Sequence, residues 1–255
     1  MTRRRFFAPP SAFKSDESVT LTSDEARHLR DVLRLKPGAE VHVFNGAGRE
    51  FCCVVSRIAR DVTALEVLNE VEPARPESPL SLKLAVALLK GEKFEFVVQK
   101  ATELGATAIV PVITRFADIR LRDQSDAYKR VGRWQRIALE AAKQSGRAVV
   151  PGVSNPVAFS TLLNDTASVG SLRLMFSERG GGSLSDMQAK AGQDGREPAM
   201  IEALVGSEGG WADEEIQEAR AAGWQIVTLG GRTLRAETAA ISVAAILQHI
   251  YGDFK

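Results

Sequence analysis

Two arginines and a glutamate near the carboxyl end of the chain are the residues best suited to chemistry. Arg232 and Arg235 follow a Gly-Gly turn, and Glu237 follows them at the start of a predicted helix. A guanidinium group can stabilise negative charge that develops on a reacting oxygen. For Arg232, an ion pair with Glu208 or Glu237, or a phosphate contact, is an equally good interpretation. Glu237 can orient Arg235 or act as a base, and we favour orientation because a neighbouring arginine lowers the pKa of a carboxyl group.

A second glycine-rich loop, VGSEGG at 205–210, also follows an apolar strand. Two such strand–glycine–helix junctions can line one pocket with backbone groups, which suits an adenine nucleoside. Neither loop matches the G-x-G-x-x-G or G-x-x-x-x-G-K-[ST] fingerprint, which disfavours a Rossmann dehydrogenase and a P-loop ATPase. No G-x-S-x-G elbow of a serine hydrolase is present. The three histidines are scattered and the two cysteines, Cys52 and Cys53, are adjacent on opposite faces of a predicted strand, so we expect no metal site and no disulfide.

The pocket residues lie in a part of the chain where apolar strands and helices alternate. This alternation predicts an α/β fold with an open, mostly parallel sheet covered by helices on both faces. Ligands of such sheets bind beyond the carboxyl ends of the strands, where both loops lie. The expected strands are 82–89, 107–113, 171–176, 199–205 and 224–229, and the expected helices are 92–104, 126–145, 158–163, 212–222 and one that begins near 236.

Residues 1–72 are expected to be mostly β-structure with one helix, which is typical of a small barrel. Asn45-Gly46 is a hairpin signal, and Thr22 followed by Glu25 is a capping-box signature that opens a helix through Leu33. Residues 72–80 carry three prolines in nine positions. We therefore divide the chain into a domain at 1–72, a linker at 73–80 and a domain at 81–255.

The composition allows a sizeable core and shows no overall charge preference. The 255 residues are 44% hydrophobic and carry a net charge of +1. No apolar run approaches a membrane span and no signal-peptide core follows the basic N-terminus, so we expect a cytoplasmic protein without a membrane partner. Residues 1–36 hold 8 Lys or Arg against 5 Asp or Glu, which predicts a local basic surface in the N-terminal arm.

Several segments, in their order along the chain, resemble the RsmE family. They are RRRFF at 3–7, HLRDVLRLKPG at 28–38, KGEKFEFVVQKATELG at 90–105, RWQRIALEAAKQSGR at 133–147, VGSEGGW at 205–211 and LGGRTLRAETAA at 229–240. RsmE enzymes methylate N3 of a uridine in small-subunit ribosomal RNA with S-adenosylmethionine, and they belong to the SPOUT methyltransferases. The resemblance implies a SPOUT domain with a C-terminal trefoil knot, preceded by a PUA-like RNA-binding β-barrel. It also implies a homodimer whose partner is small-subunit ribosomal RNA or the assembled small subunit.

On this interpretation, Arg235 stabilises the charge that spreads onto the uracil carbonyl oxygens, and Glu237 completes the catalytic pair. Lys90, Glu92 and Lys93 match a family motif, without an assigned role. The expected cofactor residues are Phe176, Ser177, Val205, Gly206, Glu208, Gly209, Gly210, Leu229, Gly230, Arg232 and Leu234. The expected RNA contacts are Arg3, Arg4, Arg5, Phe6, Arg30 and Arg34, although Phe6 can equally belong to the core of the first strand.

Two loop residues depart from the family pattern. Ser207 stands at a position where the family usually has proline. Gly231 stands at a second position where the family often has proline. Both replacements are expected to loosen the loops. They motivate a second hypothesis, an RNA-binding or ribosome-assembly protein that retains the fold without catalysis. A third, a nucleotide-dependent enzyme of another reaction type, is disfavoured by the missing phosphate-loop fingerprints.

Overall fold

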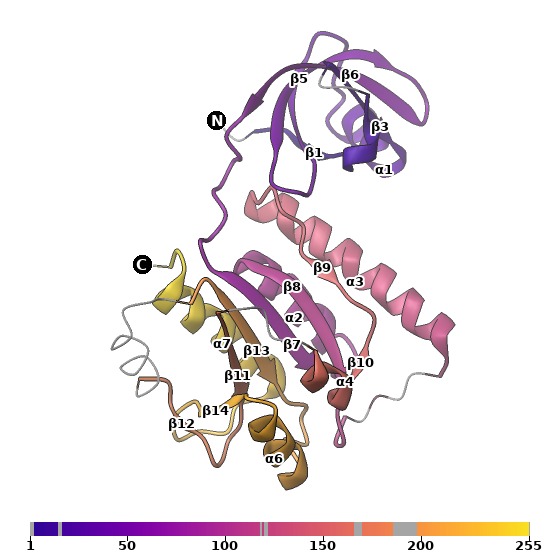
Figure 1. The fold of residues 1–255 in the computed structure, drawn as a ribbon. Helices are drawn as coiled ribbons and strands as arrows, with labels where there is room; N and C mark the ends of the chain where they lie inside the picture. Colours follow the sequence, from indigo (N-terminus) through magenta and orange to yellow (C-terminus); the bar gives the residue numbers. More distant parts are fainter. Residues whose placement is uncertain are drawn as a thin grey trace. The chain divides into compact units, whose positions relative to one another are not determined.

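The structure is a computed structural model, and it describes residues 3–14, 17–117, 119, 122–165, 170–185 and 198–254. The chain divides into two compact units (Figure 1). The first comprises Met1–Glu77 and Leu139–Val150, and the second comprises Ser78–Ala138 and Pro151–Lys255. Residues Leu139–Val150, which are distant in sequence, thus belong to the N-terminal unit. No helix among the described residues is long and apolar enough to cross a membrane.

The N-terminal unit is built on a curled six-stranded sheet (Figure 1). Its strands are β1 (Arg5–Phe7), β2 (Phe13–Lys14), β3 (Ser18–Thr22), β4 (Glu40–Phe44), β5 (Glu50–Ile58) and β6 (Val62–Val71), in the order β1-β4-β5-β6-β3-β2. The β1–β4 pair is parallel and the other pairs are antiparallel. The hairpin predicted at Asn45-Gly46 is confirmed, since the Asn45 side chain accepts hydrogen bonds from the backbone N–H groups of Ala47 and Arg49. Alternate strand residues, including Phe6, Leu21 and Leu65, fill the core.

The helix predicted from Thr22 exists, but its predicted capping box does not. The chain forms α1 (Ser23–Arg27) and continues as the π-helix η3 (His28–Val32), and a short 3-10 helix, η1 (Pro10–Ala12), precedes β2. Thr22 makes no side-chain cap hydrogen bond. The carboxylate of Glu25 instead accepts a hydrogen bond from Lys143 Nζ at 2.7 Å, so a tertiary ion pair has replaced the local contact.

The C-terminal unit is an α/β sheet in which every pairing between described strands is parallel. Its strands are β7 (Ser81–Ala87), β8 (Ala106–Ile113), β9 (Gly152–Val153), β10 (Val157–Ala158), β11 (Ser171–Phe176), β12 (Gly182–Ser183), β13 (Met200–Val205) and β14 (Gln225–Thr228), in the order β10-β8-β7-β13-β11-β14-β12 with β9 beside β8. Its helices are α2 (Lys93–Glu103), α3 (Gln124–Ser145), α4 (Phe159–Asn164), α6 (Asp213–Ala221) and α7 (Ala236–Tyr251), and the end of α3 belongs to the N-terminal unit. The predicted fold class is confirmed.

Apolar side chains explain why both faces of this sheet are covered. One core joins Phe159 and Leu162 of α4, Ile216 of α6 and the sheet residues Met175 and Leu204. Helices α2 and α7 pack against each other, and α7 contacts β7 and β13 (Figure 1). Strand β13 is buried from Ile201 to Val205, as expected for a strand covered on both faces.

The segment between β11 and β12 passes directly against the backbone of β14. A Cβ atom on Gly181 would lie 2.7 Å from the carbonyl carbon of Val227 and 2.8 Å from the amide nitrogen of Thr228. Only glycine allows such a close approach of two backbones. The next two residues, Gly182 and Ser183, form β12 and pair with Val227 and Thr228 of β14.

Candidate active site

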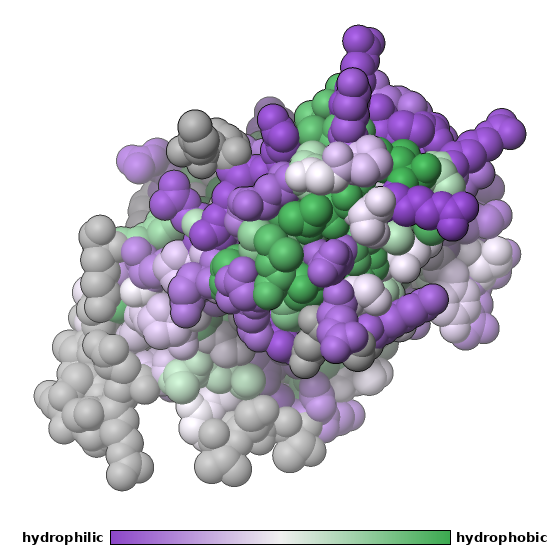
Figure 2. All heavy atoms as spheres, turned by 90° about the horizontal axis from the view of Figure 1, so that it is seen from above, coloured by the Kyte–Doolittle hydropathy of each residue, from purple (hydrophilic) through white to green (hydrophobic). Residues whose placement is uncertain are grey.

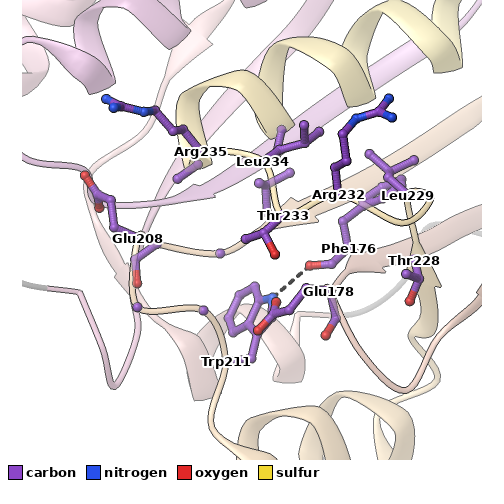
Figure 3. Close-up of a pocket in the computed structure, with 18 of the residues that line it drawn as sticks. Phe176, Glu178, Glu208, Trp211, Thr228, Leu229, Arg232, Thr233, Leu234 and Arg235 are labelled. Atoms are coloured by element: carbon purple, nitrogen blue, oxygen red, sulfur yellow. Dashed lines mark hydrogen bonds between the residues drawn. The ribbon is translucent and has the colours of Figure 1, made fainter.

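A pocket of about 510 Å³ lies at the carboxyl ends of β11, β13 and β14 (Figure 3). Three loops line it, namely 176–178 after β11, 205–211 after β13 and 228–235 after β14, together with the first turns of α7. This is the edge at which the parallel sheet was expected to bind a ligand. All eleven residues expected to hold a cofactor line the pocket, as does Arg235.

Glycines let the loop after β13 follow the pocket wall. Gly210 has φ +69°, and a Cβ there would lie 2.8 Å from Glu178 Oε1. A Cβ on Gly206 would lie 3.0 Å from the indole of Trp211. The close approach of this backbone to its neighbours leaves main-chain groups, rather than side chains, to face a ligand.

Trp211 and Ser207 fix the same loop. Trp211 is buried, and its indole N–H donates a hydrogen bond to the Phe176 carbonyl at 2.8 Å, which ties the β13 loop to the end of β11 (Figure 3). Ser207 is also buried, and its hydroxyl donates to the Phe116 carbonyl at 3.0 Å. The serine thus supplies an anchor that proline cannot, and the expected loosening of this loop stays a prediction.

Lys93 connects the two glycine-rich loops from outside the pocket. Its Nζ donates a hydrogen bond to Glu208 Oε1 at 2.9 Å and lies 3.9 Å from Glu237 Oε2. Partial burial opposes ionisation of Glu208, but the hydrogen bond and charge of Lys93 and the backbone hydrogen bonds to this carboxylate together outweigh it, so the pKa of Glu208 lies below its ordinary value. Glu237 Oε2 is buried and has no hydrogen-bond partner among the described residues. Lys93 thus stands beside the two carboxylates that the sequence offered as partners for Arg232.

The two arginines leave the loop after β14 in different directions (Figure 3). Both are exposed, and neither forms an ion pair within the described part of the chain. Arg235 is the N-cap residue of α7, and its carbonyl accepts a hydrogen bond from Ala239 at 2.8 Å. Its backbone is therefore held by a helix, whereas Arg232 stands in the loop itself. A guanidinium group on a fixed base is the better placed of the two for charge stabilisation.

Sequence reasoning missed two polar groups of the pocket. Glu178 follows β11 directly and points toward Trp211 in Figure 3. Thr228 ends β14, and its hydroxyl is buried with no partner among the described residues. Glu178 could have been found by extending the predicted strand 171–176 by two residues, and Thr228 by taking the polar residue inside the carboxyl end of the predicted strand 224–229.

These features fit S-adenosylmethionine. The volume lies in the range of about 300–1,000 Å³ typical of small-molecule sites. The carboxylates of Glu178 and Glu208 suit a ligand that carries a sulfonium and an ammonium group. The partnerless Thr228 hydroxyl and the glycine-lined wall offer hydrogen-bonding groups for a nucleoside.

The residues expected to contact RNA divide into buried and exposed ones. Phe6 is fully buried in the core, so its expected role in stacking on a base is wrong. Arg5 is only 8% exposed in its side chain; it pairs with the buried Glu50 at 2.9 Å and donates to the carbonyls of Lys143 and Arg147. The prediction that Arg5 contacts RNA is therefore wrong, because its guanidinium group is already bound within the protein.

The other expected RNA contacts keep some exposure. Arg3 also pairs with Glu50, with 34% of its side chain exposed, and Arg4 is exposed. Arg30 pairs with Asp31 at 2.6 Å and donates to the Arg60 carbonyl. The hydrogen bond from Arg30 holds the pKa of Asp31 below its ordinary value. Arg34 is exposed with φ +50°.

Comparisons with known proteins agree with this geometry. A family described as "RNA methyltransferase domain" matches residues 76–248, and one described as "RNA methyltransferase PUA domain" matches residues 21–62. The chain is 36% identical over 240 residues to the ribosomal RNA small subunit methyltransferase E of Synechocystis, covering 94% of this chain and 75% of that protein. It is 28% identical to the Bacillus subtilis protein of the same name, covering 96% of each chain.

Solved structures are similar over the whole chain. The ribosomal RNA small subunit methyltransferase E of Neisseria gonorrhoeae, bound to S-adenosyl methionine, is 34% identical with a TM-score of 0.86 and full coverage of both chains. A putative methyltransferase of Legionella pneumophila, in complex with the same cofactor, is 30% identical with a TM-score of 0.86, covering 99% of this chain and 100% of that one.

Proposed function

The chain belongs to the RsmE family of RNA methyltransferases, and on that premise we propose that it transfers a methyl group from S-adenosylmethionine to N3 of a uridine in small-subunit ribosomal RNA. The observation that carries the proposal is the pocket at the ends of β11, β13 and β14. Its glycine-lined loops, its two carboxylates and the Thr228 hydroxyl suit the cofactor that the two similar structures bind.

The cofactor supplies the methyl group, and the protein must prepare the nucleotide. Uracil N3 loses its proton to solvent, and the negative charge spreads onto the two neighbouring carbonyl oxygens. We propose that the Arg235 guanidinium stabilises this charge from the start of α7. Holding the two reactants in line contributes a further large part of the rate.

Glu237 acts in this proposal as a positioning residue. One of its oxygens is buried without a hydrogen-bond partner among the described residues and lies 3.9 Å from Lys93 Nζ. Lys93, held between Glu208 and Glu237, then fixes the start of α7 relative to the loop after β13.

RNA is proposed to meet the N-terminal domain, residues 1–72, which the linker at 73–80 joins to the methyltransferase domain at 81–255. Arg3, Arg4, Arg30 and Arg34 supply the positive charge for phosphates. Figure 2 shows apolar side chains gathered on one face among hydrophilic ones, and the exposed large apolar residues of this unit include Val32, Leu33, Val62 and Leu68. Apolar surface beside arginines suits a partner that offers both bases and phosphates.

The proposed assembly is a cytoplasmic homodimer that acts on small-subunit ribosomal RNA or the assembled small subunit. Helix α7 supports the dimer because Ile246 and Ile250, which share a face with the buried Val243 and Leu247, stay partly exposed. The proposed fold also includes a knot of the C-terminal segment, as the resemblance to the family implies.

Transfer of a labelled methyl group tests the function. The protein is incubated with radiolabelled S-adenosylmethionine and unmodified small-subunit RNA, either free or in assembled subunits, and the nucleosides are separated. We expect label in 3-methyluridine. Binding of S-adenosylhomocysteine without any label in RNA or subunits would favour the non-catalytic RNA-binding protein instead. Label in another nucleoside would keep the methyltransferase and overturn the N3 assignment.

A further inference from the structure

We propose that Glu40, His42 and Cys52, on the sheet of the N-terminal unit, form a binding site for a divalent transition-metal ion, with Zn²⁺ the best fit. A carboxylate oxygen of Glu40, a ring nitrogen of His42 and the Cys52 sulfur all lie within 4.8 Å of one another. The three residues come from two neighbouring strands, β4 and β5. Nothing in the methyl-transfer chemistry uses them.

Strand pairing explains why the cluster forms. His42 and Cys52 are direct partners in the antiparallel β4–β5 ladder. The His42 N–H donates to the Arg4 carbonyl at 2.9 Å, on the side of β1, and so does not point toward β5. His42 and Cys52 are therefore a non-hydrogen-bonded pair, the kind in which facing side chains lie closest. Glu40 lies two residues before His42 and thus on the same face.

The donor set selects the class of metal. One sulfur, one imidazole nitrogen and one carboxylate oxygen suit Zn²⁺ and the neighbouring transition metals, whereas Mg²⁺ and Ca²⁺ take oxygen donors. Three protein ligands leave the fourth tetrahedral position to water. Cys52 is 9% exposed and Glu40 is exposed, so the open position faces solvent on the Glu40 side. The Cys52 proton passes to solvent as the sulfur–metal bond forms, which balances the binding step.

The surrounding charges permit a cation. The nearest positive groups are Arg3 and Arg5, and the buried Glu50 pairs with both at 3.1 Å and 2.9 Å. Once the Cys52 thiol has lost its proton, the three anionic groups of Glu40, Glu50 and Cys52 outnumber the two guanidinium groups.

The adjacent cysteine provides a matched control. Cys53 is fully buried in the core on the opposite face of β5, where burial raises its pKa to about 12. It cannot reach the cluster without turning the strand over. Two neighbouring thiols of one strand therefore have opposite predicted responses to a metal ion.

Titration of the complete, tag-free protein with Co²⁺ tests the site, since thiolate ligation gives a sulfur-to-cobalt charge-transfer absorption. We expect this absorption, at one equivalent and displaced by Zn²⁺, in the wild type and in Cys53→Ala. It should disappear in Cys52→Ser, and affinity should fall at least about tenfold in His42→Gln and in Glu40→Gln, as expected for loss of a ligand. Circular dichroism checks that each variant is folded.

Thermal unfolding gives a second readout. A ligand that binds only the folded state raises the melting temperature, so Zn²⁺ should stabilise the wild type and Cys53→Ala but not Cys52→Ser. Absence of the charge-transfer absorption in the folded wild type would overturn the proposal. So would an absorption that survives Cys52→Ser. Neither outcome bears on methyl transfer, because the cluster and the cofactor pocket lie in different units.

Discussion

The sequence identified the residues that line the cofactor pocket better than it identified the exposed residues of the N-terminal arm. Every residue expected to bind the cofactor lines one pocket. Of the residues expected to bind RNA, Phe6 and Arg5 are instead parts of the core and of a buried ion pair. The pocket is set by topology, because loops after parallel strands must meet at one edge. Exposure of a strand residue depends on which face it takes and what packs there, and a short strand reveals neither.

Arg235→Ala removes the guanidinium group that is proposed to stabilise charge on the uracil. We expect turnover to fall by about 10²–10³-fold, the loss typical of removing one charge-stabilising group, with S-adenosylhomocysteine affinity nearly unchanged. Single-turnover kinetics and calorimetry measure the two quantities. Arg232→Ala is the matched control, since Arg232 lies on the same loop without the support of α7, and its effect on turnover should be much smaller. Equal losses in both variants would remove the special role of Arg235.

Arg5→Ala tests the contribution of Arg5 to the stability of the N-terminal unit. Glu50 is fully buried and would lose its nearer guanidinium partner, so we expect a loss of about 3 kcal/mol in the free energy of unfolding. Denaturant titration measures it. Arg4→Ala, one position away and exposed, should leave stability unchanged and weaken RNA binding instead. A stable Arg5→Ala variant with poor RNA affinity would reverse the roles given to these two arginines.

The glycines of the pocket offer a smaller and more local test. Gly210→Ala places a Cβ 2.8 Å from Glu178 Oε1 at φ +69°, which costs about 1–2 kcal/mol and should weaken cofactor binding by about tenfold. Gly231→Ala has no neighbour within 4 Å of its new Cβ and should bind normally. Calorimetry with S-adenosylhomocysteine compares them. If Gly231→Ala lost as much affinity as Gly210→Ala, the close fit of the backbone at Gly210 would not be what determines cofactor affinity.

The smallest expected effect is a shift in pH dependence on Lys93→Met. The hydrogen bond from Lys93 lowers the pKa of Glu208, so Glu208 stays ionised to lower pH in the wild type, and its contribution is lost only as pH falls through that lowered pKa. Without Lys93 the pKa of Glu208 rises, and cofactor affinity should decline at a higher pH on the acid side. Lys100→Met on the same helix, which pairs with Glu103 instead, is the control. If cofactor affinity declined at the same pH in Lys93→Met as in the wild type, ionisation of Glu208 would have no role in cofactor binding.

The sequence predicted the parallel sheet, its helices and both glycine-rich loops because these depend on periodicity and on residues near in the chain. It could not predict the contact of Lys93 with Glu208, which joins residues 115 positions apart. Nor could it show that Lys143 takes the carboxylate of Glu25 from the predicted capping box. The absence of a metal site, expected from scattered histidines, is a prediction that the Glu40–His42–Cys52 cluster now puts to the test.

A crystal structure of the protein with S-adenosylhomocysteine tests the cofactor pocket directly. We predict ligand density between the loops 205–211 and 228–235, bounded by Glu178 and Trp211, with the Arg235 side chain on the side open to RNA. Ligand density elsewhere on the chain, with solvent in this pocket, would contradict it.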